Sequence, residues 1–272
     1  MEQPVLVIEA GKSERQYWRD ILRYRELFYF LSWRDVLVRY KQTVIGIAWS
    51  VLRPFLTMLV FTLFGMLAKL PSEGVPYPLL TLAALLPWQF FANALTESSG
   101  SLITNANMIT KIYFPRLVIP TSAVVVSFID FLISFAIFVG MLLWYRFVPP
   151  VTILLMPLFA LLCFAVAMGA GLWFAALTVK YRDFRYVVPF IVQIGLYVSP
   201  VAFSSSIVPA KYQALYALNP MVGIIDGFRW SLLGTTAFPS TGIISAVLIA
   251  LLLNITGIIY FRKTERAFAD II

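Results

Sequence analysis

Six long apolar runs constrain the fold of this 272-residue chain more than any other feature of its sequence. A run of about 20 apolar residues crosses the hydrocarbon core of a bilayer as a helix, whereas membrane strands are shorter and alternate in polarity. Charged residues make up 12% of the chain, about half the share in a typical soluble domain. The sequence therefore predicts an all-α integral membrane protein with six transmembrane helices, at residues 44–67, 77–95, 117–145, 151–179, 187–203 and 242–261.

A basic, aromatic-rich segment precedes the first of these spans. Between residues 14 and 31, apolar side chains recur at helical spacing and arginines fill the positions between them. An amphipathic helix of this kind lies in the headgroup layer of a membrane. Ser32 followed by Asp35 predicts a capping box that starts a second helix. We expect residues 1–43 to form a cytoplasmic tail and an interfacial helix, and residues 44–272 to form the six-helix transmembrane domain.

The distribution of basic residues predicts the orientation. Sixteen Lys and Arg residues fall in residues 1–43 and in the loops and tail on the same side of the predicted spans, and four fall on the other side. Cytoplasmic segments collect Lys and Arg, so both termini are expected in the cytoplasm. The same bias accounts for the net charge of +8 without a nucleic-acid partner. Gly11-Lys12-Ser13 lacks the earlier glycine of a phosphate-binding loop.

Several interruptions mark the spans. Pro54 predicts a kink in the first span, and Arg53 beside it either snorkels to the cytoplasmic edge or faces a polar path.

Asp130 is expected to face the bundle interior, and Glu97 stands alone in a polar loop that begins at residue 96. A short helix is predicted within residues 105–113 of that loop. Gly169 and Gly171 are expected to allow close helix contact.

The segment between the fifth and sixth spans has no run long enough to cross. We expect two short re-entrant helices on the outer side, at residues 209–218 and 221–233, because irregular backbone at membrane depth needs protein or water beside it. Asp226 and Arg229 lie on one face of the second helix and can neutralise each other.

The sequence offers few of the residue types that enzyme active sites use. The chain has no histidine, and its one cysteine, Cys163, lies in an apolar run. No two acidic residues are close in sequence and poised for metal binding, so we expect no metal site and no catalytic residues.

Five segments together resemble one known family. They are residues 34–54, Leu86-Pro-Trp-Gln-Phe-Phe91, the loop at residues 105–116 that ends in Phe-Pro-Arg, residues 179–184, and residues 219–234. This set is similar to the permease subunit of type-2 ATP-binding-cassette exporters, in the polysaccharide branch that exports O-antigen, capsule or teichoic acid. The resemblance covers the chain from about residue 14 onward.

The resemblance implies a set of partners. The permease would be a homodimer in the bacterial cytoplasmic membrane, paired with two copies of a separate ATPase subunit that binds the ATP, so this chain would hold no cofactor. The interfacial helix and the loop at residues 99–116 would contact that ATPase, with Asn105, Lys111, Tyr113 and Arg116 as candidate coupling residues. The substrate would be a glycan on a polyprenyl-diphosphate lipid, taken up from among the membrane lipids.

Candidate substrate contacts follow from this implied substrate. Sugar rings pack on aromatic faces, so Tyr212, Tyr216, Phe228 and Trp230 are candidates for the channel wall, although aromatic residues also form ordinary interface belts. Arg53 is a further channel candidate, because it can face a polar path. Arg39 and Lys41, and Arg53 as well, are candidates for the diphosphate headgroup, although the bias of basic residues toward the cytoplasm also explains them. The alternatives are an exporter of a drug or small lipid from the same superfamily and, with less support, a membrane enzyme acting on lipid-linked sugars.

Overall fold

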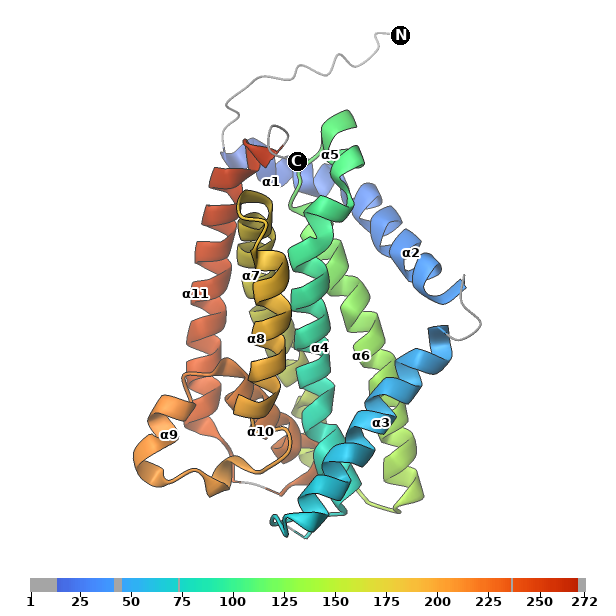
Figure 1. Cartoon of the computed structure of the whole chain (residues 1–272), viewed down its shortest axis with the longest axis vertical. Helices are drawn as coiled ribbons and strands as arrows, with labels where there is room; N and C mark the ends of the chain where they lie inside the picture. The colour runs from blue at the N-terminus through green and yellow to red at the C-terminus, as the bar shows by residue number, and fades with distance from the viewer. Residues whose placement is uncertain (1–13, 42–45, 73, 236, 269–272) are drawn as a thin grey trace.

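The protein is described by a computed structural model that covers residues 14–41, 46–72, 74–235 and 237–268, and these residues form helices, turns and loops without any strand. Figure 1 shows long helices that run side by side, with shorter helices at both ends of the bundle. The predicted tail at residues 1–13 and the join at residues 42–45 lie outside the described residues.

The long helices coincide with the predicted apolar runs. In the described part of the chain, four segments are long and apolar enough to cross a membrane. They are α4 (Tyr77–Thr104), α6 (Val118–Trp144), α7 (Met156–Lys180) with the 3-10 turn η1 (Val151–Leu155) before it, and α11 (Ser240–Glu265). The other two predicted spans fall on shorter apolar stretches, within α3 (Gly46–Leu67) and in α8 (Phe184–Val198). Helix α3 continues through Pro54.

Helix α4 is the centre of the bundle. In its apolar stretch 72% of the residues are buried, against 22% to 33% in the other three long segments. It packs along α6 and α7, and α7 in turn packs along α11. Both predicted glycine contacts are confirmed: a Cβ on Gly169 would lie 2.8 Å from the backbone of Asn254, and one on Gly171 would lie 2.6 Å from Ser98 Oγ.

The polar loop predicted from residue 96 is wrong for its first nine residues, because α4 continues to Thr104. Four hydroxyls of this stretch, those of Thr96, Ser99, Ser101 and Thr104, donate to carbonyl oxygens three or four residues earlier in the same helix. Such bonds satisfy a hydroxyl inside a helix. The predicted short helix after it is present as α5 (Ala106–Lys111).

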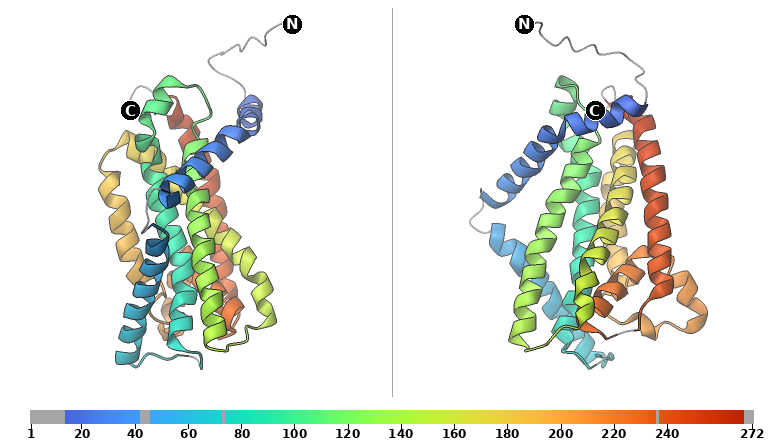
Figure 2. Two further views of the ribbon diagram at one scale, coloured as in Figure 1. Left: turned by 90° about the vertical axis from the view of Figure 1, so that its right-hand side faces the viewer. Right: turned by 180° about the vertical axis from the view of Figure 1, so that it is seen from behind.

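The amphipathic segment also breaks at a different place than predicted. Helix α1 (Glu14–Arg23) and helix α2 (Arg25–Lys41) are separated by a turn at Tyr24. The capping box at Ser32 is therefore a wrong prediction: Ser32 is buried inside α2, beside Leu31, which packs in the hydrophobic core at this end of the bundle. Figure 2 shows α2 sloping from the α1 end down the side of the bundle.

The two short helices expected before the last span are present as α9 (Ala210–Tyr216) and α10 (Pro220–Leu233). They lie at the end of the bundle opposite α1 and α5 (Figure 1). The Asn219 side chain caps α10 by accepting from the Met221 N–H at 3.0 Å, and Gly234 ends it with a φ of 67°, a conformation that favours glycine. Nearly all of α10 is buried, including the charged Asp226 and Arg229.

Candidate functional site: a polar cavity beside the central helix

Two stripes of polar side chains face one cavity from the central part of the bundle. They lie at spacings of three or four residues, which places each stripe on one face of its helix. The stripes are Gln89, Asn93 and Glu97 on α4, and Ser127, Asp130 and Ser134 on α6. By helix geometry Glu97 lies about 10 Å and Gln89 about 22 Å along the axis from the end of α4 at Thr104, so the stripe reaches well into the apolar span.

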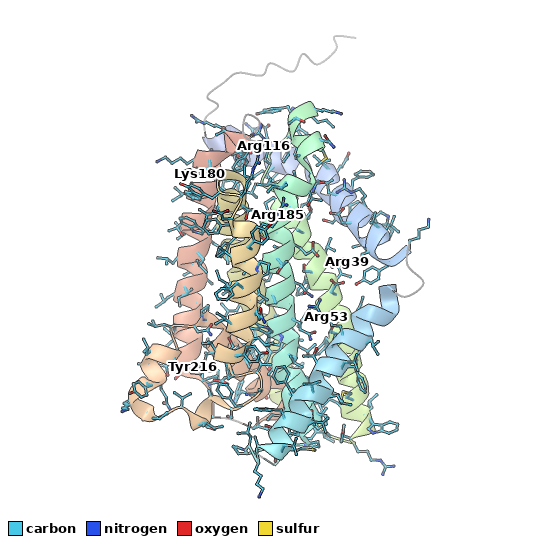
Figure 3. The ribbon with its side chains drawn as sticks, viewed as in Figure 1. Arg39, Arg53, Arg116, Lys180, Arg185 and Tyr216 are labelled. Carbon is cyan, nitrogen blue, oxygen red and sulfur yellow. The ribbon has the colours of Figure 1, made fainter. Side chains whose placement is uncertain are left out.

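The cavity between these stripes has a volume of about 350 Å³ and is also lined by residues of α2 and α3. Apolar walls come from Pro54, Leu86, Phe90 and Phe131, and the polar groups from α2 and α3 are Arg39, Tyr40 and Arg53. Figure 3 shows Arg39 and Arg53 in the space that α2 and α3 leave beside α4 and α6.

Arg39 joins three helices across this cavity. Its guanidinium donates to Glu97 Oε1 at 2.9 Å and forms an ion pair with Asp130. The neighbouring Tyr40 hydroxyl also donates to Asp130. Because Glu97 belongs to α4 and Asp130 to α6, this network fixes the far end of α2 against the bundle.

The other predicted cations are placed differently. Arg53 lines the cavity from α3 with an exposed side chain, and no ion pair to it is found within the described residues. Lys41 is exposed at the end of α2 and is not among the residues that line the cavity. The expected contacts of Arg39, Lys41 and Arg53 with a diphosphate stay predictions.

The aromatic channel candidates belong to α9 and α10, and none of the four is among the residues that line the cavity. Phe228 is fully buried and packs edge-on against Phe131, with ring centroids 6.0 Å apart. Trp230 is half-buried between aromatic neighbours, and Tyr216 is half-buried while Tyr212 is exposed. Figure 3 shows Tyr216 at the end of the bundle opposite Arg116. The structure thus does not gather these four side chains with Arg53.

The coupling candidates gather at the α1 and α5 end. Lys111 and Tyr113 are exposed on and just after α5. Asn105 accepts from Arg34 Nη2 at 3.1 Å, which ties the start of α5 to α2. Arg116 is held more firmly: its backbone N–H donates to Glu265 Oε1 at 2.8 Å, and its guanidinium donates to the Glu265 carbonyl.

Glu265 connects that contact to the amphipathic helix α1. Tyr17 donates to Glu265 Oε2 at 2.9 Å, and the guanidinium of Arg262 lies 4.5 Å from the centre of the Tyr17 ring. Burial raises the pKa of Tyr17 above its ordinary value, and the Glu265 carboxylate raises it further. Helix α1, the segment after α5 and the end of α11 therefore meet at one carboxylate.

Sequence reasoning missed the convergence of Glu97 and Asp130, which it treated as separate acids. The structure brings both to Arg39. The polar stripes on α4 and α6 did carry a sequence signal, namely polar residues at helical spacing inside or next to apolar runs, but the predicted loop at residue 96 concealed the first stripe.

Comparison with known proteins relates this arrangement to transporters. The model of the ABC-2 type transporter family matches residues 26–233, which include all four helices around the cavity. Two proteins of Klebsiella pneumoniae, each called O-antigen export system permease protein RfbA, are 28% and 29% identical over 250 residues, covering 91% of this chain and 95% of each relative. A protein of the same name from Myxococcus xanthus is 26% identical over 214 residues, covering 78% of this chain and 82% of the relative.

Proposed function

The chain belongs to the family of ABC-2 type transporters, and we propose that it is the transmembrane subunit of an ATP-driven exporter that moves lipid-linked polysaccharide out across the bacterial cytoplasmic membrane. One observation carries this proposal: the similarity to O-antigen export permeases extends over 91% of this chain and 95% of those relatives. The exported glycan is of the O-antigen, capsule or teichoic-acid type, and its carrier is a polyprenyl diphosphate.

The proposed topology has six spans, α3, α4, α6, α7, α8 and α11, with α9 and α10 re-entrant on the outer side. The basic residues support the orientation: Arg116 and Lys180 lie at the α1 and α5 end (Figure 3), as do Arg262 and Lys263 in the last turn of α11. Because cytoplasmic segments collect Lys and Arg, this end is proposed to face the cytoplasm.

Two kinds of partner complete the proposed exporter. Two ATPase subunits would bind at the cytoplasmic end, where α5 offers exposed Lys111 and Tyr113. A second copy of this chain would pack on the faces of α3 and α8, both of which lie beside α4 (Figure 1) and expose large apolar side chains such as Phe64 and Phe190. Arg53 and Lys41 are the proposed contacts of the diphosphate, because Arg39 is already engaged by two carboxylates.

Depleting the chain from cells that make the glycan tests the function. An exporter subunit leaves synthesis intact, so polymer of normal chemical structure should accumulate on the cytoplasmic side. Its location is measured by antibody access before and after the membrane is opened. Loss of polymer synthesis itself, with no ATPase co-purifying, would overturn the proposal.

A further inference from the structure

The geometry points to the cavity between α2, α3, α4 and α6 as a binding site for a neutral, hydroxyl-rich ligand: one sugar unit of the exported glycan, held by Gln89 and Asn93. This inference rests on the proposed function and assigns it a specific subsite. The site lies beside α4 in the body of the bundle and takes the sugar rather than the charged part of the substrate.

The amides of Gln89 and Asn93, which face the cavity, are the first observation. Within the described part of the chain, the side chains of Gln89 and Asn93 form no hydrogen bond, although both line the cavity from an apolar helix. Each amide offers one acceptor oxygen and two donor hydrogens. Both side chains are half-buried, and polar groups that face a cavity bond to water or to a ligand. Sugar hydroxyls both donate and accept, and therefore match both halves of each amide.

The charge balance is the second observation. Two arginines and two carboxylates line the cavity, so their formal charges cancel. Arg39 is held by both Glu97 and Asp130. A phosphate that entered the cavity would meet these two carboxylates, and like charges repel each other. A neutral ligand carries no such penalty.

The shape and walls are the third observation. A volume of about 350 Å³ is at the lower end of the range for small-molecule sites, which combine apolar walls with a few convergent polar groups. Phe90 and Phe131 supply the apolar wall with ring centroids 5.6 Å apart, and the C–H face of a sugar can pack on it. Arg53, exposed at the cavity, remains for the phosphate next to that sugar.

Ligand binding by the purified protein tests this subsite. The full chain, with any ATPase subunit that co-purifies, is placed in lipid nanodiscs. The probe is the oligosaccharide released by mild acid from the lipid-linked glycan of the same cells, and its binding is followed by saturation-transfer NMR. We expect transfer to the oligosaccharide that sodium pyrophosphate does not reduce.

Matched variants locate the binding. Asn93→Leu and Gln89→Leu should each weaken oligosaccharide binding about tenfold, the effect of losing one or two neutral hydrogen bonds. Asn107→Leu makes the same kind of change at an exposed position on α5, which does not line the cavity, and should leave binding unchanged. If one variant fails to assemble, the other carries the comparison, and the pyrophosphate measurement needs only the native chain.

Three results would overturn the subsite. They are no saturation transfer from the native protein to the oligosaccharide, displacement of the oligosaccharide by pyrophosphate, or unchanged oligosaccharide binding in both cavity variants. The last is expected if the cavity holds only water. Depletion of the chain separates this failure from failure of the proposed function. Blocked export together with native binding by the variants removes the subsite alone, whereas export that continues without the chain removes the function.

Discussion

The guanidinium of Arg39, near the end of α2, forms an ion pair with the carboxylate of Asp130, in the middle of α6. The two residues are 91 positions apart in the chain. The side chain of Asp130 is 15% exposed and that of Arg39 is 32% exposed, so the pair is only partly shielded from solvent. Together with the Tyr40 hydroxyl, this contact holds α2 against the bundle where the described part of α2 ends.

Replacing Asp130 with Asn should loosen α2. The change removes the negative charge that pairs with Arg39, and we expect the free energy of unfolding in detergent to fall by about 1–3 kcal/mol, less than for a fully buried pair because Arg39 keeps access to water. Glu97→Gln is the control: its carboxylate is 52% exposed, and exposed pairs contribute about 1 kcal/mol or less. An equal or larger loss in Glu97→Gln would contradict this ranking.

Replacing Arg229 with Lys should destabilise the α9 and α10 end. The fully buried guanidinium donates to the carbonyls of Phe203 at 2.8 Å and Val201 at 3.1 Å. A single ammonium group cannot donate to both carbonyls in the way that the two guanidinium nitrogens do. We therefore expect a loss of about 2–4 kcal/mol in the free energy of unfolding.

The matched control for Arg229 is Lys211→Met, a basic residue exposed on α9, which should change stability by about 0.5 kcal/mol or less. Thermal unfolding followed by circular dichroism measures both variants. A loss in Arg229→Lys as small as in Lys211→Met would show that the carbonyl contacts are dispensable.

Replacing Tyr17 with Phe should free α1 from α11. The variant lacks the hydrogen bond to Glu265, and we expect amide hydrogen exchange in α1 to speed up by an amount equivalent to about 1 kcal/mol. Tyr29→Phe, exposed on α2, is the control and should leave α1 protected.

The effect of Tyr17→Phe should not vary between about pH 7.5 and 9, because the ordinary tyrosine pKa is already near 10. Burial and Glu265 raise the pKa of Tyr17 further. A raised pKa in the folded state means that the phenol keeps its proton, and the stability it contributes is lost only as the pH rises above the unfolded value. If the difference in α1 hydrogen exchange between native protein and Tyr17→Phe shrank between about pH 7.5 and 9, this would be evidence against a protonated Tyr17 that donates to Glu265.

Lys111→Glu should uncouple the proposed ATPase without disturbing the fold. Lys111 is exposed on α5, and reversing one charge at a contact that matters should lower glycan-dependent ATP hydrolysis about tenfold. Arg116→Glu is a less selective test, because Arg116 also binds Glu265.

Lys211→Glu makes the same charge reversal at the opposite end and should leave ATP hydrolysis unchanged. Membrane insertion is checked for each variant by cell fractionation. Native hydrolysis rates in Lys111→Glu would move the ATPase contact away from α5.

The apolar runs alone determined the class of fold and the positions of the long helices. An uninterrupted apolar run must satisfy its own backbone hydrogen bonds in lipid, and a helix does this locally. Hence the six runs fall on helices, and the two short helices before α11 were predicted as well. The polar residues 96–104 were less informative. Ser and Thr hydroxyls bond to backbone groups in turns and helix caps, but they can also bond to a carbonyl within a helix.

Tertiary packing decided which distant side chains meet. Glu97 and Asp130 reach Arg39 across separations of 58 and 91 residues, and Arg229 reaches the carbonyl of Phe203. Such meetings depend on how each helix is rotated and how closely it approaches its neighbours, as at Gly169. Periodicity shows which residues share a face of one helix, but it does not show which helix that face will contact.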